Sequence, residues 1–189
     1  MRAIDLFSGT RSATRCFEEA GWDVDYVDVL EGRDIRSYHA TKADFVWASP
    51  PCTEDSYFNR KFSTWESKYD SDPTLRNEAM RVIAEARPRY WIIEGVKGAQ
   101  QRYGKAPYKY GAFFLWGYFP FERLPTIAWT TSLKGTHADR KIETTKNGGL
   151  YQWDEGRSPA HKAMIPEELA KAVFKEMNRL FPKMEVQSR

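Results

Sequence analysis

The chain has 189 residues, 29% of them charged and 15% aromatic, which is the composition of a globular domain and not of a disordered segment. Its formal net charge of +3 is too small to identify a nucleic-acid partner by itself. No apolar run approaches the roughly 18 residues of a membrane span, and two cysteines, Cys16 and Cys52, are too few for a disulfide framework. We therefore expect one domain over residues 1–189, located in the cytoplasm.

The first third of the chain begins with a strand, a turn, a helix and a second strand. Residues 3–7, apolar except for Asp5, predict the first strand, which runs into Ser8-Gly9-Thr10. Apolar side chains recur at helical spacing over residues 13–20, so a helix with Cys16 on its buried side is expected. Residues 24–29 predict the second strand, and carboxylates follow at Asp28, Glu31 and Asp34. This order is typical of nucleotide-binding α/β folds, where the turn meets an anion and a carboxylate takes ribose hydroxyls.

A rigid corner with a cysteine follows the next predicted strand. Residues 44–47 are apolar, and Pro50 and Pro51 then fix the backbone directly before Cys52. A thiol at a stiff strand end, with polar residues after it, is placed like a nucleophile. A lone cysteine is also common as a small buried residue, and Cys16 has that explanation in its helix.

A third strand end carries a carboxylate. The polar and aromatic residues 55–70 predict a mobile loop, and apolar spacing predicts a helix that ends before Pro88. Residues 90–93 form the next apolar strand and end in Glu94. In a parallel α/β sheet the strand ends converge on the ligand crevice, so Ser8, Cys52 and Glu94 are expected at one edge.

The second half of the chain mixes aromatic and basic residues. The segment from Lys97 to Lys109 interleaves cations with tyrosines, which suits a phosphate backbone and bases but also an ordinary solvated face. Further strands are expected in the apolar segments 112–116, 119–123 and 127–130, with the chain turning into an antiparallel arrangement. Polar loops are expected over residues 132–158. Ile165-Pro166 opens a last amphipathic helix.

Five motifs, in this order, resemble the DNA (cytosine-5)-methyltransferase family. They are Asp5-Leu6-Phe7-Ser8-Gly9, Ser49-Pro50-Pro51-Cys52, Glu94-Gly95-Val96, the segment 120–127 with Arg123, and Ile165-Pro166 with the helix that follows. The chain departs from the family pattern at Arg11 and Ser12, where glycines are expected, and at Gly95, where an asparagine is expected. Residues 128–164 are also too few for the separate target-recognition domain that the family places there.

The resemblance implies an α/β, Rossmann-like S-adenosylmethionine-dependent methyltransferase fold, a mixed, mostly parallel sheet with helices on both faces. It implies Cys52 as the nucleophile that adds to cytosine C6, Glu94 as the acid at the base, and Arg123 as a contact to the base carbonyl. The cofactor-binding residues that it implies are Asp5, Phe7, Ser8, Gly9, Thr10, Asp28, Asp34, Pro51 and Ile165. No metal site is implied.

The implied partner is DNA, with the target base flipped out of any duplex. The chain resembles the catalytic domain alone, as in compact phage and mobile-element proteins that act in a host cell. Target choice would then use a very short sequence context, a specificity partner or a homodimer. Two alternatives stay open: a transferase acting on another pyrimidine, as free nucleotide or RNA, and a catalytically silent methyltransferase-like subunit that binds nucleic acid or cofactor.

Overall fold

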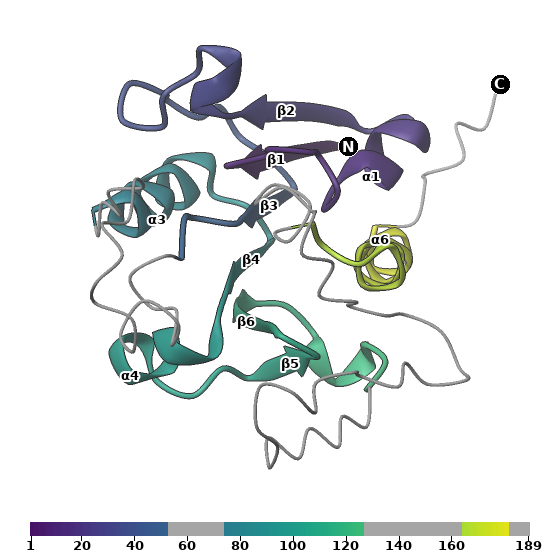
Figure 1. Cartoon of the computed structure of the whole chain (residues 1–189). Coiled ribbons are helices and arrows are strands. Elements are labelled where there is room, and N and C mark those ends of the chain that lie inside the picture. Colours follow the sequence, from purple (N-terminus) through teal and green to yellow (C-terminus); the bar gives the residue numbers. More distant parts are fainter. Residues whose placement is uncertain (53–73, 127–163, 182–189) are drawn as a thin grey trace, which may run out of the picture.

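The computed structural model describes residues 1–52, 74–126 and 164–181. Their strands form one six-stranded sheet in the order β2-β1-β3-β4-β6-β5 (Figure 1). The strands are β1 (Arg2–Leu6), β2 (Asp23–Val27), β3 (Phe45–Ala48), β4 (Tyr90–Gly95), β5 (Tyr108–Tyr110) and β6 (Phe113–Tyr118). The first four run parallel, and β6 is antiparallel to both β4 and β5. The mixed, mostly parallel sheet predicted from the sequence is confirmed.

Helices cover both faces of this sheet (Figure 1). The helices α1 (Arg15–Glu19) and α6 (Glu167–Leu180) share one apolar cluster with Ala3 of β1, whereas α3 (Leu75–Ala86) shares the other with Ile4 and Leu6. Successive side chains of a strand point to opposite faces, so β1 contributes to both clusters. Short helical turns complete the described chain: η1 (Val29–Glu31), η2 (Lys97–Ala99), α4 (Gln100–Tyr103) and η3 (Phe121–Arg123).

The helix α6 is an integral part of the core. Its Leu169, Val173 and Met177 side chains are fully buried, and each such burial stabilises the fold by roughly 1.5–3 kcal/mol. The Phe17 ring of α1 stands edge-on to Phe174 of α6, with 5.0 Å between ring centroids. The last described helix is thus packed against the first.

Two predictions about the second half need correction. Residues 119–123 were expected as a strand, but β6 ends at Tyr118 and η3 follows, because Pro120 supplies no N–H to a ladder. The three-residue strand β5 was not predicted, although Tyr108 and Tyr110 are buried and Lys109 between them is exposed. The antiparallel turn is confirmed, while residues 127–130 lie outside the described residues. Within the described part of the chain, no helix is long and apolar enough to cross a bilayer.

Candidate active site

One edge of the sheet collects the predicted site residues. The strands β1 to β4 run parallel, so their carboxyl ends lie at the same edge. Ser8 follows β1, Asp28 follows β2 and Cys52 follows β3. Glu94 is the next-to-last residue of β4. The structure therefore brings these four residues to one edge, from four separate segments.

The turn after β1 has an unusual backbone. Phe7 (φ 61°), Gly9 (φ 45°) and Arg11 (φ 59°) all lie in the left-handed region, which is uncommon for residues other than glycine. Hydrogen bonds hold this shape: Phe7 N donates to Val27 O (2.8 Å), and Arg11 N donates to Ser8 O (2.6 Å). The family's glycine is thus replaced by an arginine that adopts a glycine-like conformation, which costs of the order of 1 kcal/mol.

Asp28 determines where this turn sits. Its Oδ2 accepts the Gly9 N–H (2.9 Å) and its Oδ1 accepts the Leu30 N–H (2.8 Å). A carboxylate oxygen has two lone pairs, so each can accept a further hydroxyl. Asp28 therefore orients the turn and still presents acceptors to a ligand.

The turn fits a polar ligand such as S-adenosylmethionine. The Ser8 hydroxyl is buried and has no hydrogen-bond partner in the described part of the chain, and a buried polar group of this kind costs free energy until it is paired. A Cβ added at Gly9 would meet only Phe7 O, at 3.9 Å, so the space beside the turn is open. The residues present here are consistent with the cofactor that the motifs imply.

Asp5 lies beneath the turn. Its side chain is buried, and its Oδ2 accepts a hydrogen bond from the Thr14 hydroxyl at 2.6 Å. Burial raises the pKa of Asp5 to about 7, although the Thr14 hydrogen bond acts in the opposite direction. The carboxyl group thus links β1 to Thr14, the residue before α1, and so stabilises the two ends of the turn.

Glu94 is a buried carboxyl group without a partner among the described residues. Its side chain is 9% exposed, and burial raises its pKa to about 8. At neutral pH the group is therefore largely protonated and can donate a hydrogen bond. A carboxyl group held neutral at a strand end can stabilise negative charge that develops on a bound substrate.

The register of β3 and β4 places the Cys52 segment next to Glu94. Ala48 pairs with Ile93, so Ser49 and Glu94 follow at adjacent strand ends. The Ser49 hydroxyl accepts a hydrogen bond from Trp47 Nε1 (2.9 Å), and Pro50 is buried, which fixes the segment leading to Cys52. Cys52 is partly exposed there, whereas burial raises the pKa of Cys16 on α1 to about 11. Both thiols are partly exposed, and of the two only Cys52 lies at this edge of the sheet.

The segment before α6 returns to the turn. Ile165 is buried, and its N–H donates a hydrogen bond to the Ser12 hydroxyl at 2.9 Å. Ser12 is another position where the family pattern has glycine, and here its side chain secures residues from the far end of the chain. The sequence did not predict this contact.

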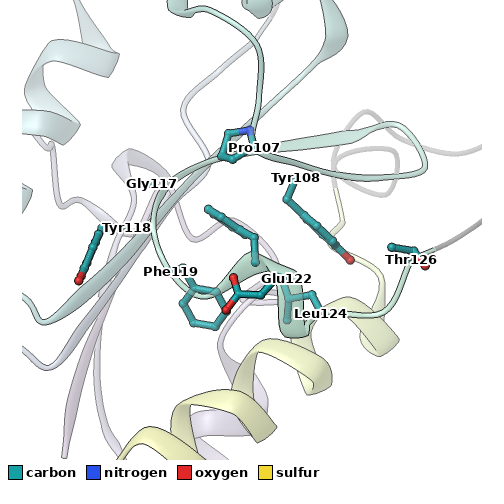
Figure 2. A pocket seen from close by; sticks show the side chains of 9 residues that line it. Pro107, Tyr108, Gly117, Tyr118, Phe119, Glu122, Leu124 and Thr126 are labelled. Carbon is teal, nitrogen blue, oxygen red and sulfur yellow. The ribbon is translucent and has the colours of Figure 1, made fainter.

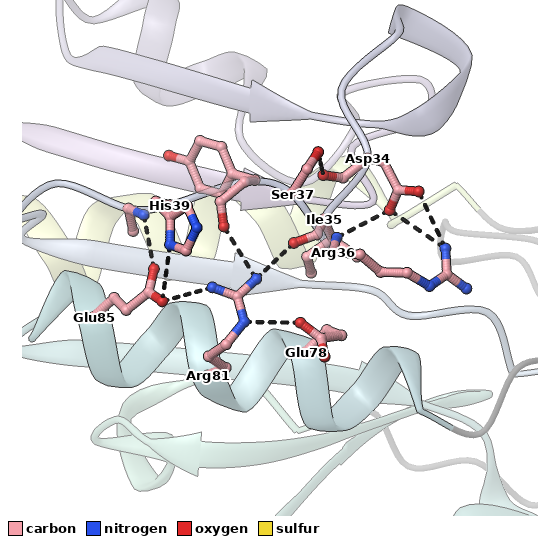
Figure 3. Close-up of polar contacts among 10 residues, drawn as sticks. Asp34, Ile35, Arg36, Ser37, His39, Glu78, Arg81 and Glu85 are labelled. Carbon is pink, nitrogen blue, oxygen red and sulfur yellow. Dashed lines mark hydrogen bonds and ion pairs between the residues drawn. The ribbon is translucent and has the colours of Figure 1, made fainter.

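Asp34 lies in a loop that α3 holds in place (Figure 3). Its Oδ1 accepts the Arg36 N–H (2.9 Å), and that hydrogen bond is the main cause of its lowered pKa. The guanidinium group of Arg81 on α3 donates to the carbonyl oxygens of Ile35 (2.7 Å) and Tyr38 (3.0 Å). The spacing of Glu78, Arg81 and Glu85 predicts ion pairs on one helix face, but the loop carbonyls could not be predicted.

Arg123 is not brought to this edge. Because β6 is antiparallel to β4, with Leu115 opposite Glu94 and Tyr118 opposite Trp91, the chain after β6 lies beyond the amino end of β4. There Arg123 Nε lies 3.5 Å from Glu176 Oε1 of α6. A cavity of about 520 Å³ beside η3 is lined by Tyr118, Phe119 and Glu122 (Figure 2).

The other predicted residues border the site. Thr10 is partly exposed and its carbonyl oxygen accepts a hydrogen bond from Arg15 (2.9 Å), while Pro51 is exposed beside Cys52. Phe7 is partly buried. The predicted loops 55–70 and 132–158 lie outside the described residues. Among residues 1–52, 74–126 and 164–181, no group of three or more His, Cys, Asp or Glu side chains is arranged to hold a metal ion.

Comparison with known proteins gives one decisive relative. The protein named "Probable DNA (cytosine-5)-methyltransferase" from Frog virus 3 (isolate Goorha) is 36% identical over 155 residues, which cover 69% of this chain and 70% of the viral protein. The chain belongs to the DNA (cytosine-5)-methyltransferase family. The enzyme class and the α/β fold predicted from the motifs are thereby confirmed.

Two other comparisons add little to this assignment. No family model matches the methyltransferase. A prophage-encoded E. coli protein, assigned as a DNA modification methyltransferase, has a crystal structure that is 20% identical, with a TM-score of 0.38. That likeness covers 55% of this chain and only 34% of the E. coli chain, and it is too slight to support an inference.

One departure of this methyltransferase from its family pattern has a packing explanation. A Cβ at Gly95 would lie 3.3 Å from Cζ3 of Trp116, closer than ordinary van der Waals contact. The indole is fixed by a hydrogen bond from Nε1 to Gly104 O (3.1 Å). Trp116 therefore leaves no room for an asparagine side chain at position 95 unless the ring shifts.

Proposed function

We propose that this methyltransferase transfers a methyl group from S-adenosylmethionine to C5 of cytosine in DNA, through a covalent Cys52 adduct. The observation that carries this proposal is the buried, unpaired Glu94 carboxyl group at the strand end adjacent to the Cys52 segment. Family membership supports the substrate class.

The chemistry needs both residues. Cytosine C5 is a poor nucleophile while the ring is aromatic, and addition of the Cys52 thiolate to C6 forms an S–C6 bond that moves an electron pair toward C5 and N3. Glu94, protonated near neutral pH, donates a hydrogen bond or its proton to N3 and stabilises the charge that develops there. When bound, S-adenosylmethionine supplies an electrophilic methyl group. Loss of the C5 proton to a base and cleavage of the S–C6 bond then release the methylated base and the thiolate.

The cofactor would be held by the turn after β1. Ser8 presents its unpaired hydroxyl, Gly9 leaves the space open, and Asp28 offers free lone pairs for ribose hydroxyls. Ile165, bound to Ser12, closes the same region from the other end of the chain. Asp5 supports the turn indirectly through Thr14.

A covalent-trapping experiment tests the proposal. DNA with 5-fluorocytosine at target positions should form a cofactor-dependent adduct with the protein, because fluorine does not leave as a proton does. The adduct should vanish in Cys52→Ser and persist in the matched control Cys16→Ser. Glu94→Gln should retain cofactor affinity while methyl transfer slows by roughly two or more orders of magnitude.

The same assay separates the alternatives. An adduct that is lost with Cys16→Ser and retained with Cys52→Ser would reverse the assignment of the nucleophile. Transfer of labelled methyl groups to RNA or dCMP, but not to duplex or single-stranded DNA, would identify a different pyrimidine substrate. Cofactor binding with no adduct on any substrate would indicate a silent subunit.

A further inference from the structure

A long part of the chain beside the proposed catalytic edge carries no acidic residue. Residues 95–121, from the end of β4 to the start of η3, contain neither aspartate nor glutamate. Lys97, Lys105 and Lys109 lie in this part, and all three side chains are exposed. We call these three residues the lysine surface.

None of the three lysines of the lysine surface forms an ion pair with a described carboxylate. Several other cations are neutralised locally: Arg33 binds Asp25, Arg81 binds two glutamates of its own helix, and Lys171 binds Glu167. Uncompensated cations on one part of a surface raise the local positive potential and attract a polyanion.

The lysine surface lies near the carboxyl end of β4. Lys97 comes two residues after β4 ends. Lys109 pairs with Phe114, which pairs in turn with Gly95, so Lys109 lies two strands away from the carboxyl end of β4, a separation of about 10 Å. Lys105 lies between them in the sequence, in the connection from α4 to β5.

Packing holds this connection in a defined shape. The Arg76 guanidinium of α3 lies 3.5 Å from the centroid of the Tyr103 ring, and Tyr103 stands edge-on to Trp116. The Ala106 N–H donates to Gln100 Oε1 (3.2 Å), so the backbone on either side of Lys105 is fixed. The Lys109 ammonium lies 5.6 Å from the centroid of the Phe114 ring. The charges are thus presented by ordered segments.

We propose that the lysine surface binds the phosphates of the DNA strand whose cytosine reacts at Cys52. This inference rests on the proposed function and adds to it the surface of the protein that contacts the DNA backbone. Exposed ammonium groups act as hydrated point charges that suit phosphate oxygens. Contacts of this kind position a strand without reading its bases.

The salt dependence of DNA affinity tests the lysine surface. The variant Lys97→Gln/Lys105→Gln/Lys109→Gln is compared with Lys42→Gln/Lys171→Gln/Lys175→Gln, which removes the same charge from exposed sites elsewhere. Binding of a labelled duplex is measured by fluorescence anisotropy between about 50 and 200 mM salt. The first variant should bind at least about tenfold more weakly at low salt, and its slope of log K against log salt should fall by about 0.9 per lost phosphate contact.

Two further measurements keep the outcomes distinct. Affinity for S-adenosylhomocysteine, measured by calorimetry, should be equal in both variants, which shows that the fold is intact. At saturating DNA the lysine-surface variant should still form the 5-fluorocytosine adduct. If the two triple variants show the same affinity and salt slope, the lysine surface is only a solvated face and the inference fails. If the wild-type protein forms no adduct while its salt slope still depends on these lysines, the proposed function fails and the DNA surface stands.

Discussion

Asp28 Oδ2 accepts the backbone N–H of Gly9 at 2.9 Å, so the carboxylate after β2 fixes the turn after β1. The same carboxylate binds the Leu30 N–H, and the two hydrogen bonds join the loops that follow two neighbouring strands. The turn proposed to bind the cofactor therefore depends on residues that follow two different strands, and Asp28 both holds its shape and offers acceptors to the proposed ligand.

Replacing Asp28 or Gly9 should weaken cofactor binding. In Asp28→Ala the Gly9 N–H loses its charged acceptor, and affinity for S-adenosylhomocysteine should fall by about tenfold or more, since such hydrogen bonds contribute roughly 1.5–3 kcal/mol. Gly9→Val should act more severely, because a β-branched residue is strained at φ 45° and fills the open space. Calorimetric titration measures both, with Asp23→Ala as an exposed control. Unchanged affinity in a folded Gly9→Val protein would contradict the placement of the cofactor.

Glu94 should make the protein less stable as the pH rises. Its pKa is about 8 when folded and 4.5 in its ordinary state, so between these values the folded chain holds a proton that the unfolded chain has lost. The free energy of unfolding then falls with rising pH, by up to about 1.4 kcal/mol per pH unit. Asp5, with a pKa of about 7, acts in the same direction.

Urea unfolding of the wild type and Glu94→Gln between about pH 5 and pH 9 isolates this contribution. Glutamine does not titrate, so the stability curve of the variant should be flatter, and the variant should gain relative to the wild type as the pH rises. Parallel curves for the two proteins would show that the Glu94 carboxyl group is not buried in its neutral form.

Arg81 should stabilise both the fold and the loop that carries Asp34. Arg81→Met keeps much of the aliphatic stem but removes the donors to Ile35 O, Tyr38 O, Glu78 and Glu85. We expect the free energy of unfolding to drop by about 1–3 kcal/mol and cofactor affinity to weaken. Arg81→Lys, which retains one cationic donor group, should restore only part of the stability and part of the cofactor affinity. Asn77→Ala, on the exposed side of α3, should change neither quantity. An unchanged denaturation midpoint in Arg81→Met would show that the contacts in Figure 3 are not coupled to stability.

The chain should methylate cytosine in a very short sequence context. Direct reading of a duplex needs side chains at base edges, usually from a dedicated module, and residues 131–160 are too few for such a module. Bisulfite sequencing of DNA treated with the purified protein should reveal a context of about one to three bases, or a dependence on a partner or second copy. Strict methylation of one site of about five or more base pairs by the monomer would refute this expectation.

The sequence predicts the parts of this site that depend on strand order and fails where tertiary contacts decide. Ser8, Cys52 and Glu94 follow apolar strands, and a parallel sheet brings such ends together, so their common edge was predictable. Arg123 was assigned by a motif, but the direction of β6 carries it to the opposite end of the sheet. Nothing local in the sequence indicates that Arg11 adopts a positive φ, since hydrogen bonds from distant segments hold the turn.

The position of α6 has a consequence for protein synthesis. Leu169, Val173 and Met177 cover one face of the sheet, and Ile165 secures the Ser12 turn, yet these residues leave the ribosome after every described strand. A nascent chain that has completed β1 to β6 still exposes the apolar face around Phe17, a surface of the kind that chaperones bind. The apolar core around Phe17 is therefore complete only once α6 has been synthesised.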